Sequence, residues 1–335
     1  MGTIAQRQIY AIAKHRNRKQ QRRFSQAARN PSQPALGVRR THSPYSRFES
    51  ARVSRAARSK IEVLFGPPDA PAGSYRISAS EMTSPARAPL LLLAPAIVIA
   101  VIALLLPPIP QPLAYHNFAD HRGWPGIPNF GDVVSNLPFA IVGVWGLFVV
   151  LAPGRTTFLD FREPWFYLVV FAALILTAWG SAYYHLAPDN ARLVWDRIPI
   201  MIVFMALLSA VIAERVTVNV GLALFPLLEI VGVVTVLYWQ SSELRGHGDL
   251  RFYFAVQVYA ILILLLALLL PPTYTRGADF AIVVGLYVLA KVLEETDRQV
   301  FALGHIVSGH TLKHLAAAVA GYWVLRMLTR RVAMP

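Results

Sequence analysis

Long apolar segments, separated by short polar ones, fill the chain from residue 89 to residue 328. Most are close to the roughly 20 residues that an α-helix needs to cross a bilayer. Prolines mark several of the breaks, as at 107–110 and 271–272, because a helix rarely continues through them. We read eight such segments: 89–109, 132–152, 165–185, 196–214, 218–239, 250–270, 279–295 and 305–328. The pattern predicts an all-α protein that crosses the membrane several times.

The first segment differs from the seven that follow, because it is purely apolar whereas the later ones carry polar residues. We therefore expect one additional N-terminal transmembrane helix over 89–110, followed by a seven-helix domain over 115–328. Tracing these seven helices alternately across the membrane brings four helix ends to one face. These ends are the start of 132–152, the end of 165–185 and the starts of 196–214 and 305–328.

Composition agrees with this interpretation and limits the chemistry. Of the 335 residues, 55% are hydrophobic and only 15% are charged, which is typical of a membrane protein. Cysteine is absent, so the chain forms no disulfide. Any metal ion must then be held by histidine, carboxylate or carbonyl groups.

The positive charge of the chain is concentrated at its beginning. Residues 1–88 contain 17 Lys and Arg residues against 4 acidic ones, which accounts for +13 of the net charge of +14. This segment has no apolar period, so we expect it to be disordered. It fits a basic arm for anionic lipid or nucleic acid, a mitochondrial presequence, or a start codon assigned too early. We favour a true start near Met82 and expect no nucleic-acid partner.

The charges between the apolar segments predict an orientation. On the face opposite the four helix ends lie seven arginines, namely Arg155, Arg162, Arg215, Arg276, Arg326, Arg330 and Arg331. The other face carries seven acidic residues, namely Asp120, Asp189, Glu243, Asp249, Glu294, Glu295 and Asp297. Because cytoplasmic loops are enriched in Lys and Arg, we expect cytoplasmic termini and an outward-facing site, in a bacterial inner membrane.

Histidines recur at the ends of the apolar segments. His185 ends one of them, and His310 and His314 stand four residues apart near the start of the last. Residues four apart share one face of a helix, so Ser181 points with His185, and His310 with His314. Three imidazoles can then bind one metal ion, as in catalytic zinc sites, and Asp196 and Ser181 would flank a water activated by that ion.

Other uses of these histidines are also consistent with the sequence. A single histidine at the end of a membrane helix is usually an interfacial polar residue. Ionisable groups inside membrane segments are costly, however, and a cluster of them marks a site. The same residues could also serve as axial ligands in a b-type haem protein.

Several of these motifs together resemble a known family, the alkaline ceramidases, and more broadly the CREST superfamily of seven-helix membrane hydrolases and receptors. The residues that carry the resemblance are Ser181-x-x-x-His185, Asp196, His310-x-x-x-His314 and the segment NFGDVVSN at 129–136. It covers about 115–328 and is most similar to the bacterial ceramidase-like membrane proteins.

The resemblance implies a role for each of these residues. His185, His310 and His314 would be zinc ligands. Asp196 would be the general base that takes a proton from the activated water and returns it to the leaving amine, and Ser181 would donate a hydrogen bond to the oxyanion. Animal members also have an acidic calcium loop before the first core helix. The corresponding part of this chain lacks Glu, which puts calcium binding in doubt.

The expected function is hydrolysis of the amide bond of a ceramide-like N-acyl lipid, which yields a fatty acid and an amine such as a sphingoid base. The expected partner is thus a membrane lipid. Two alternatives within the superfamily are a receptor of the progestin and adipoQ receptor type and a lipid esterase.

Overall fold

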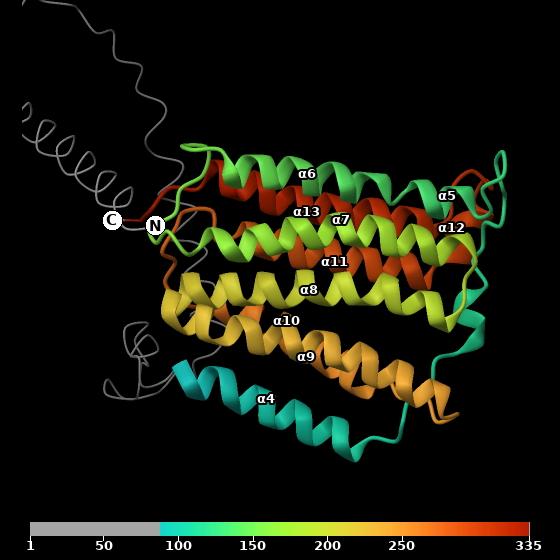
Figure 1. Ribbon diagram of the computed structural model, residues 1–335, viewed down its shortest axis with the longest axis horizontal. Coiled ribbons are helices and arrows are strands. Elements are labelled where there is room, and N and C mark those ends of the chain that lie inside the picture. Colours follow the sequence, from blue (N-terminus) through green and yellow to red (C-terminus); the bar gives the residue numbers. More distant parts are fainter. Residues whose placement is uncertain (1–87, 335) are drawn as a thin grey trace, which may run out of the picture. The chain divides into compact units, whose positions relative to one another are not determined.

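The computed structural model describes residues 88–334, and the expectations for residues 1–87 lie outside this range. The described chain forms α4 (Ala88–Leu105), η1 (Leu113–His116), α5 (Phe130–Val134), α6 (Leu137–Leu151), α7 (Pro164–Leu186), α8 (Asn190–Arg215), α9 (Val218–Leu244), α10 (Arg251–Ala267), α11 (Asp279–Glu295), α12 (Asp297–Ala302) and α13 (Gly309–Arg330). The long helices run roughly side by side (Figure 1). The predicted all-α fold class is confirmed over this range.

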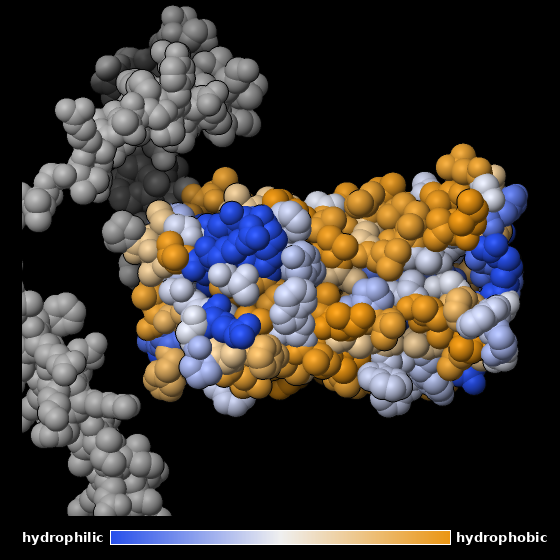
Figure 2. Space-filling view, turned by 90° about the horizontal axis from the view of Figure 1, so that it is seen from above, coloured by the Kyte–Doolittle hydropathy of each residue, from blue (hydrophilic) through white to orange (hydrophobic). Residues whose placement is uncertain are grey.

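Each of the eight predicted apolar segments coincides with a long helix of the structure. Four stretches are long and apolar enough to cross a membrane: Phe130–Leu151, Pro164–Leu186, Asn190–Arg215 and Val218–Leu244. Hydrophobic residues cover much of the face in Figure 2, and the strongly hydrophilic residues gather nearer its two ends. These features indicate an integral membrane protein, because apolar helices of this length match the hydrocarbon core.

The helix α7 occupies a central position, with α6 packed on one side and α8 on the other. The helix α13 contacts both α6 and α11, whereas α4 packs mainly on α10. Phe166 and Phe171 of α7 are fully buried in the larger apolar cluster, which also contains residues of α6, α8 and α13. One apolar cluster thus joins α6, α7, α8 and α13.

Several predicted helix boundaries differ from the structure by a few residues, and two of these differences affect the site. The helix α8 begins at Asn190, because the Asp189 side chain caps it by accepting a hydrogen bond from the amide of Arg192 at 2.7 Å. Asp196 therefore lies in the second turn of this helix and does not begin it. The predicted helix 132–152 is interrupted, because Ser135 and Asn136 donate side-chain hydrogen bonds to the carbonyl of Asp132.

A buried network of charges lies at the end of the bundle where α13 ends. The Arg331 guanidinium is 3.7 Å from Glu163 and 3.4 Å from Glu214, and it stacks on the Tyr274 ring at 3.9 Å. Arg215 also pairs with Glu214, at 3.4 Å. Arg215 and Arg331 are thus buried and paired, so two of the seven arginines used to predict the orientation are not loop charges exposed to the cytoplasm.

We expect Arg331→Met to destabilise the protein strongly, because it leaves Glu163 and Glu214 buried with less compensating charge. Breaking a buried ion pair on one side typically costs about 3–5 kcal/mol. Thermal unfolding of the detergent-purified protein measures the effect. The control is Arg330→Met, since Arg330 is exposed. Equal unfolding midpoints for the two variants would contradict the assignment.

Candidate metal centre

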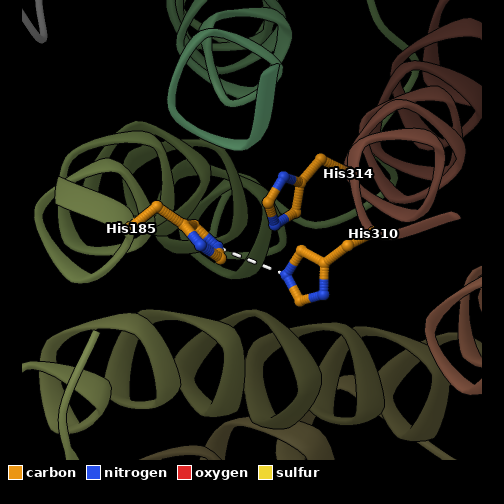
Figure 3. A group of neighbouring side chains, drawn as sticks. All are labelled: His185, His310 and His314. Carbon is orange, nitrogen blue, oxygen red and sulfur yellow. Dashed lines mark hydrogen bonds between the residues drawn. The ribbon is translucent and has the colours of Figure 1, made fainter. Parts of the chain in front are cut away.

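Three histidines from two helices converge at one end of the bundle. His185 lies near the end of α7, and His310 and His314 lie in the first two turns of α13, so that the three rings face one another (Figure 3). One ring nitrogen from each lies within 4.8 Å of the others. The three residues are between 0% and 4% exposed. The predicted grouping of these histidines is therefore confirmed, and the group can hold a metal ion.

The spacing of one pair of nitrogens fits a tetrahedral ion. The Nε2 atoms of His185 and His310 are 3.3 Å apart. Zinc–nitrogen bonds of about 2.0–2.1 Å at a tetrahedral angle place two ligand nitrogens about 3.3–3.4 Å apart. The Nδ1 atom of His185 is buried and has no hydrogen-bond partner among the described residues. Such an incompletely bonded set of imidazoles suits a cation better than an apolar core.

Ser135 determines how His314 presents its ring. The Ser135 hydroxyl donates to the carbonyl of Asp132 at 3.1 Å and lies 2.8 Å from Nδ1 of His314. In the tautomer that carries its proton on Nδ1, His314 donates this hydrogen bond to the hydroxyl, and its Nε2 lone pair is free to bind a metal ion. A hydrogen bond from the outer nitrogen to a fixed acceptor is the usual support of a metal-binding histidine.

The loop between η1 and α5 packs against the histidines. The Phe118 ring lies 4.7 Å from that of His185 and 4.4 Å from that of His310, measured between centroids. The Asn129 side-chain amide donates to the carbonyl of His185 at 2.9 Å. Asp297 accepts from the backbone amides of Ala119 and His310, both at 2.8 Å. These contacts shield the site from water and connect the loop to the start of α13.

Arg122 fastens the same loop from outside. Its guanidinium donates to both carboxylate oxygens of Asp120 and to the carbonyls of His305 and Ile306. The hydrogen bonds from Arg122 hold the pKa of the Asp120 carboxyl below its ordinary value. Asp120 therefore stays ionised at neutral pH, and the contact between the loop and the segment before α13 persists there.

Close approach of the backbones at Gly180 positions the two other predicted site residues. A Cβ atom on Gly180 would collide with the carbonyl oxygen of Trp195, so only glycine allows α7 and α8 to approach here. This contact brings Ser181 of α7 near Asp196 of α8. Both residues are buried, at 1% and 6% exposed, and the Ser181 hydroxyl has no hydrogen-bond partner in the described chain.

A cavity of about 660 Å³ reaches one of the three histidines, His314. Ser181, Asp196 and His314 line its polar part. Apolar residues of five helices line much of the rest, among them Val170, Leu174, Leu207, Leu264, Val283 and Val324. Its volume falls within the range of small-molecule sites. A long apolar ligand in this cavity can therefore place a polar group beside His314.

The sequence did not reveal every residue that builds this site. The sequence indicated Ser135 only as part of the segment 129–136, and it did not indicate Phe118. Asp132 is 1% exposed and accepts a hydrogen bond from Thr311 at 2.7 Å, so it supports the start of α13. The available signal was the polar run 129–136 opening an otherwise apolar helix.

No protein-family model matches the chain, and no curated protein matches its sequence. The described structure therefore defines only a class: a helical membrane protein with a buried group of three histidines that can bind a metal ion.

We expect about one zinc ion per chain in the detergent-purified protein and a loss of this zinc in His310→Ala, because the variant removes one of three ligands. Elemental analysis measures the metal, and an absorption spectrum tests for haem. His247→Ala is the control, because His247 is exposed in the loop between α9 and α10. Equal metal content in the wild type and His310→Ala would count against the site.

Ser135→Ala tests the support of His314. Loss of the hydrogen bond to Nδ1 should weaken metal affinity about 10–100-fold, as measured by competition with a chelator. Ser209→Ala is the matched control, because that serine is also buried but bonds only to the carbonyl of Met205 within α8. If both variants hold the metal as tightly as the wild type, Ser135 does not orient His314.

Proposed function

We propose that this protein is a zinc-dependent membrane hydrolase that cleaves the amide bond of ceramide-like N-acyl lipids. The observation that carries the proposal is the shared cavity: one apolar space reaches His314, Ser181 and Asp196 together. An acyl chain would lie along its apolar walls, with the amide at the polar part. The resemblance of these residues to the alkaline ceramidases supports the same reaction.

The side chains supply the parts of an amide hydrolysis. A zinc ion held by His185, His310 and His314 would supply Lewis acidity and a nucleophilic water at neutral pH. Asp196 takes a proton from the attacking water and delivers it to the leaving nitrogen. The Ser181 hydroxyl, which lacks a partner in the described chain, donates to the oxyanion that the carbonyl oxygen becomes when water attacks the carbonyl carbon. The carbon–nitrogen bond then breaks, and one water is consumed per fatty acid and amine released.

The membrane supplies the substrate in this proposal. The site lies where α7 ends and α13 begins, close to one end of the apolar helices. A lipid amide near the headgroup region would reach this depth without leaving the bilayer. We place this end on the periplasmic side of a bacterial inner membrane, since arginines such as Arg155, Arg162 and Arg330 lie towards the other end.

Release of fatty acid from a fluorescent ceramide by the zinc-loaded wild-type protein tests the proposal. We expect Asp196→Asn to keep the zinc but to lower kcat by about 10²–10⁴-fold, the usual contribution of general acid–base catalysis. His310→Ala should lose zinc and activity together. His247→Ala, remote in the sequence from the site residues, should retain both.

Other outcomes would identify the alternatives. Hydrolysis of lipid esters but not of N-acyl lipids would indicate the esterase. Stoichiometric binding of an N-acyl lipid by the zinc-loaded protein without turnover would indicate a receptor. Either result would refute the amidase proposal.

A further inference from the structure

Arg197 is a buried cation beside the candidate site, and its role is not explained by the proposed hydrolysis. It follows Asp196 on α8, is 5% exposed, and lines the same cavity. Its guanidinium lies over the rings of Trp239 and Tyr253, at 4.2 Å and 4.9 Å from their centroids. One Nη atom donates to the side-chain carbonyl of Gln111 at 2.5 Å, and the other has no hydrogen-bond partner among the described residues.

The other buried arginines of the described chain are paired with carboxylates. Arg331 lies within 4 Å of Glu163 and Glu214, and Arg215 within 4 Å of Glu214. Arg197 has no carboxylate within that distance in the part of the chain that the structure describes. Aromatic rings stabilise a desolvated cation, but they do not replace a charged partner. The guanidinium group matches carboxylate and phosphate groups in geometry and in charge.

A second positive group lies on the same cavity. Lys313 pairs with Glu294 at 2.6 Å, but Glu294 also pairs with Lys291, so one carboxylate serves two lysines. Tyr115 donates a third hydrogen bond to the same carboxylate at 2.9 Å. Besides Glu294, two acidic residues line the cavity, Asp196 and Glu295. Glu295 is exposed and forms no ion pair in the described range. Both lysines of the lining thus pair with a carboxylate, whereas Arg197 has none within 4 Å among the described residues.

Resting on the proposed amide hydrolysis, we propose that the amine half of the substrate carries an anionic group, a carboxylate or a phosphate, which binds Arg197. Asp196 would deliver its proton to the leaving amine, so this half of the lipid lies beside Asp196. Arg197 lines the same cavity as Asp196, so an anionic group on this half of the lipid would share that space with the guanidinium. Neutral ceramide would leave this guanidinium without its partner.

Binding measured without turnover tests this inference independently of catalysis. The probes are isosteres of N-palmitoylglycine and N-palmitoylethanolamine in which a methylene replaces the amide nitrogen, so that neither can be hydrolysed. The zinc-loaded, detergent-purified full chain should bind the anionic isostere at least about tenfold more tightly than the neutral one, because only the anion forms charge-assisted hydrogen bonds with Arg197. A third isostere with a phosphate on the ethanolamine shows which anion binds more tightly.

Substitution of Arg197 shows whether it is the source of the preference. In Arg197→Gln the ratio of the two dissociation constants should fall close to one, and Arg197→Lys should restore part of it. Arg155→Gln, at an exposed arginine beyond the end of α6, is the matched control and should keep the wild-type ratio. A merely structural role for Arg197 would weaken both ligands equally and leave the ratio unchanged.

The outcomes separate this inference from the proposed function. Equal binding of the two isosteres by the wild type, or a preference that survives in Arg197→Gln, would overturn the inference. If Arg197→Gln does not fold, the wild-type comparison and Arg197→Lys still decide. An anionic preference without hydrolysis of N-palmitoylglycine would support the inference while refuting the amidase. Hydrolysis of neutral and anionic amides at equal kcat/KM would support the amidase and overturn the inference.

Discussion

The desolvation of three imidazole rings is the constraint on which the rest of this site depends. Buried imidazole nitrogens that lack a partner are costly, and here each of three rings places a nitrogen within 4.8 Å of the others. The Nδ1 atom of His185 has no partner in the described chain, and its Nε2 atom contacts Nε2 of His310. Ser135 contacts Nδ1 of His314, and Asn129 holds the backbone carbonyl of His185. A cation at the centre would replace the contact between the rings with ligand bonds.

Two contacts between backbones make the convergence possible. Gly180 allows α7 to touch the backbone of α8, and Gly309 allows the start of α13 to touch the junction of α11 and α12. Any side chain at either glycine would push apart the helices that carry the site. The polar chemistry of this end of the bundle thus depends on packing that involves no polar side chain at all.

Much of the architecture was predictable because a membrane imposes a simple pattern. Eight apolar segments predicted eight long helices, and the i, i+4 spacing of His310 and His314 placed them on one face. What could not be predicted depended on tertiary contacts or on local capping. Asp189 caps α8 well before Asp196, and Ser135 interrupts a helix that is continuous in hydropathy. The number of spans, the reaction and the substrate remain proposals, because no pattern in the chain alone tests them.

The partners in the cluster of histidines and in the buried charge network are far apart in the sequence. His185 and His310 are separated by 125 residues, and Arg331 lies 117 residues after Glu214. During synthesis the early helices therefore enter the membrane with their polar groups unmatched. Both ends of the bundle can be completed only when α13 joins them. Incorporation of a metal ion would be a late event of biogenesis, and a protein that had acquired its ion would be one whose last helix had already assembled.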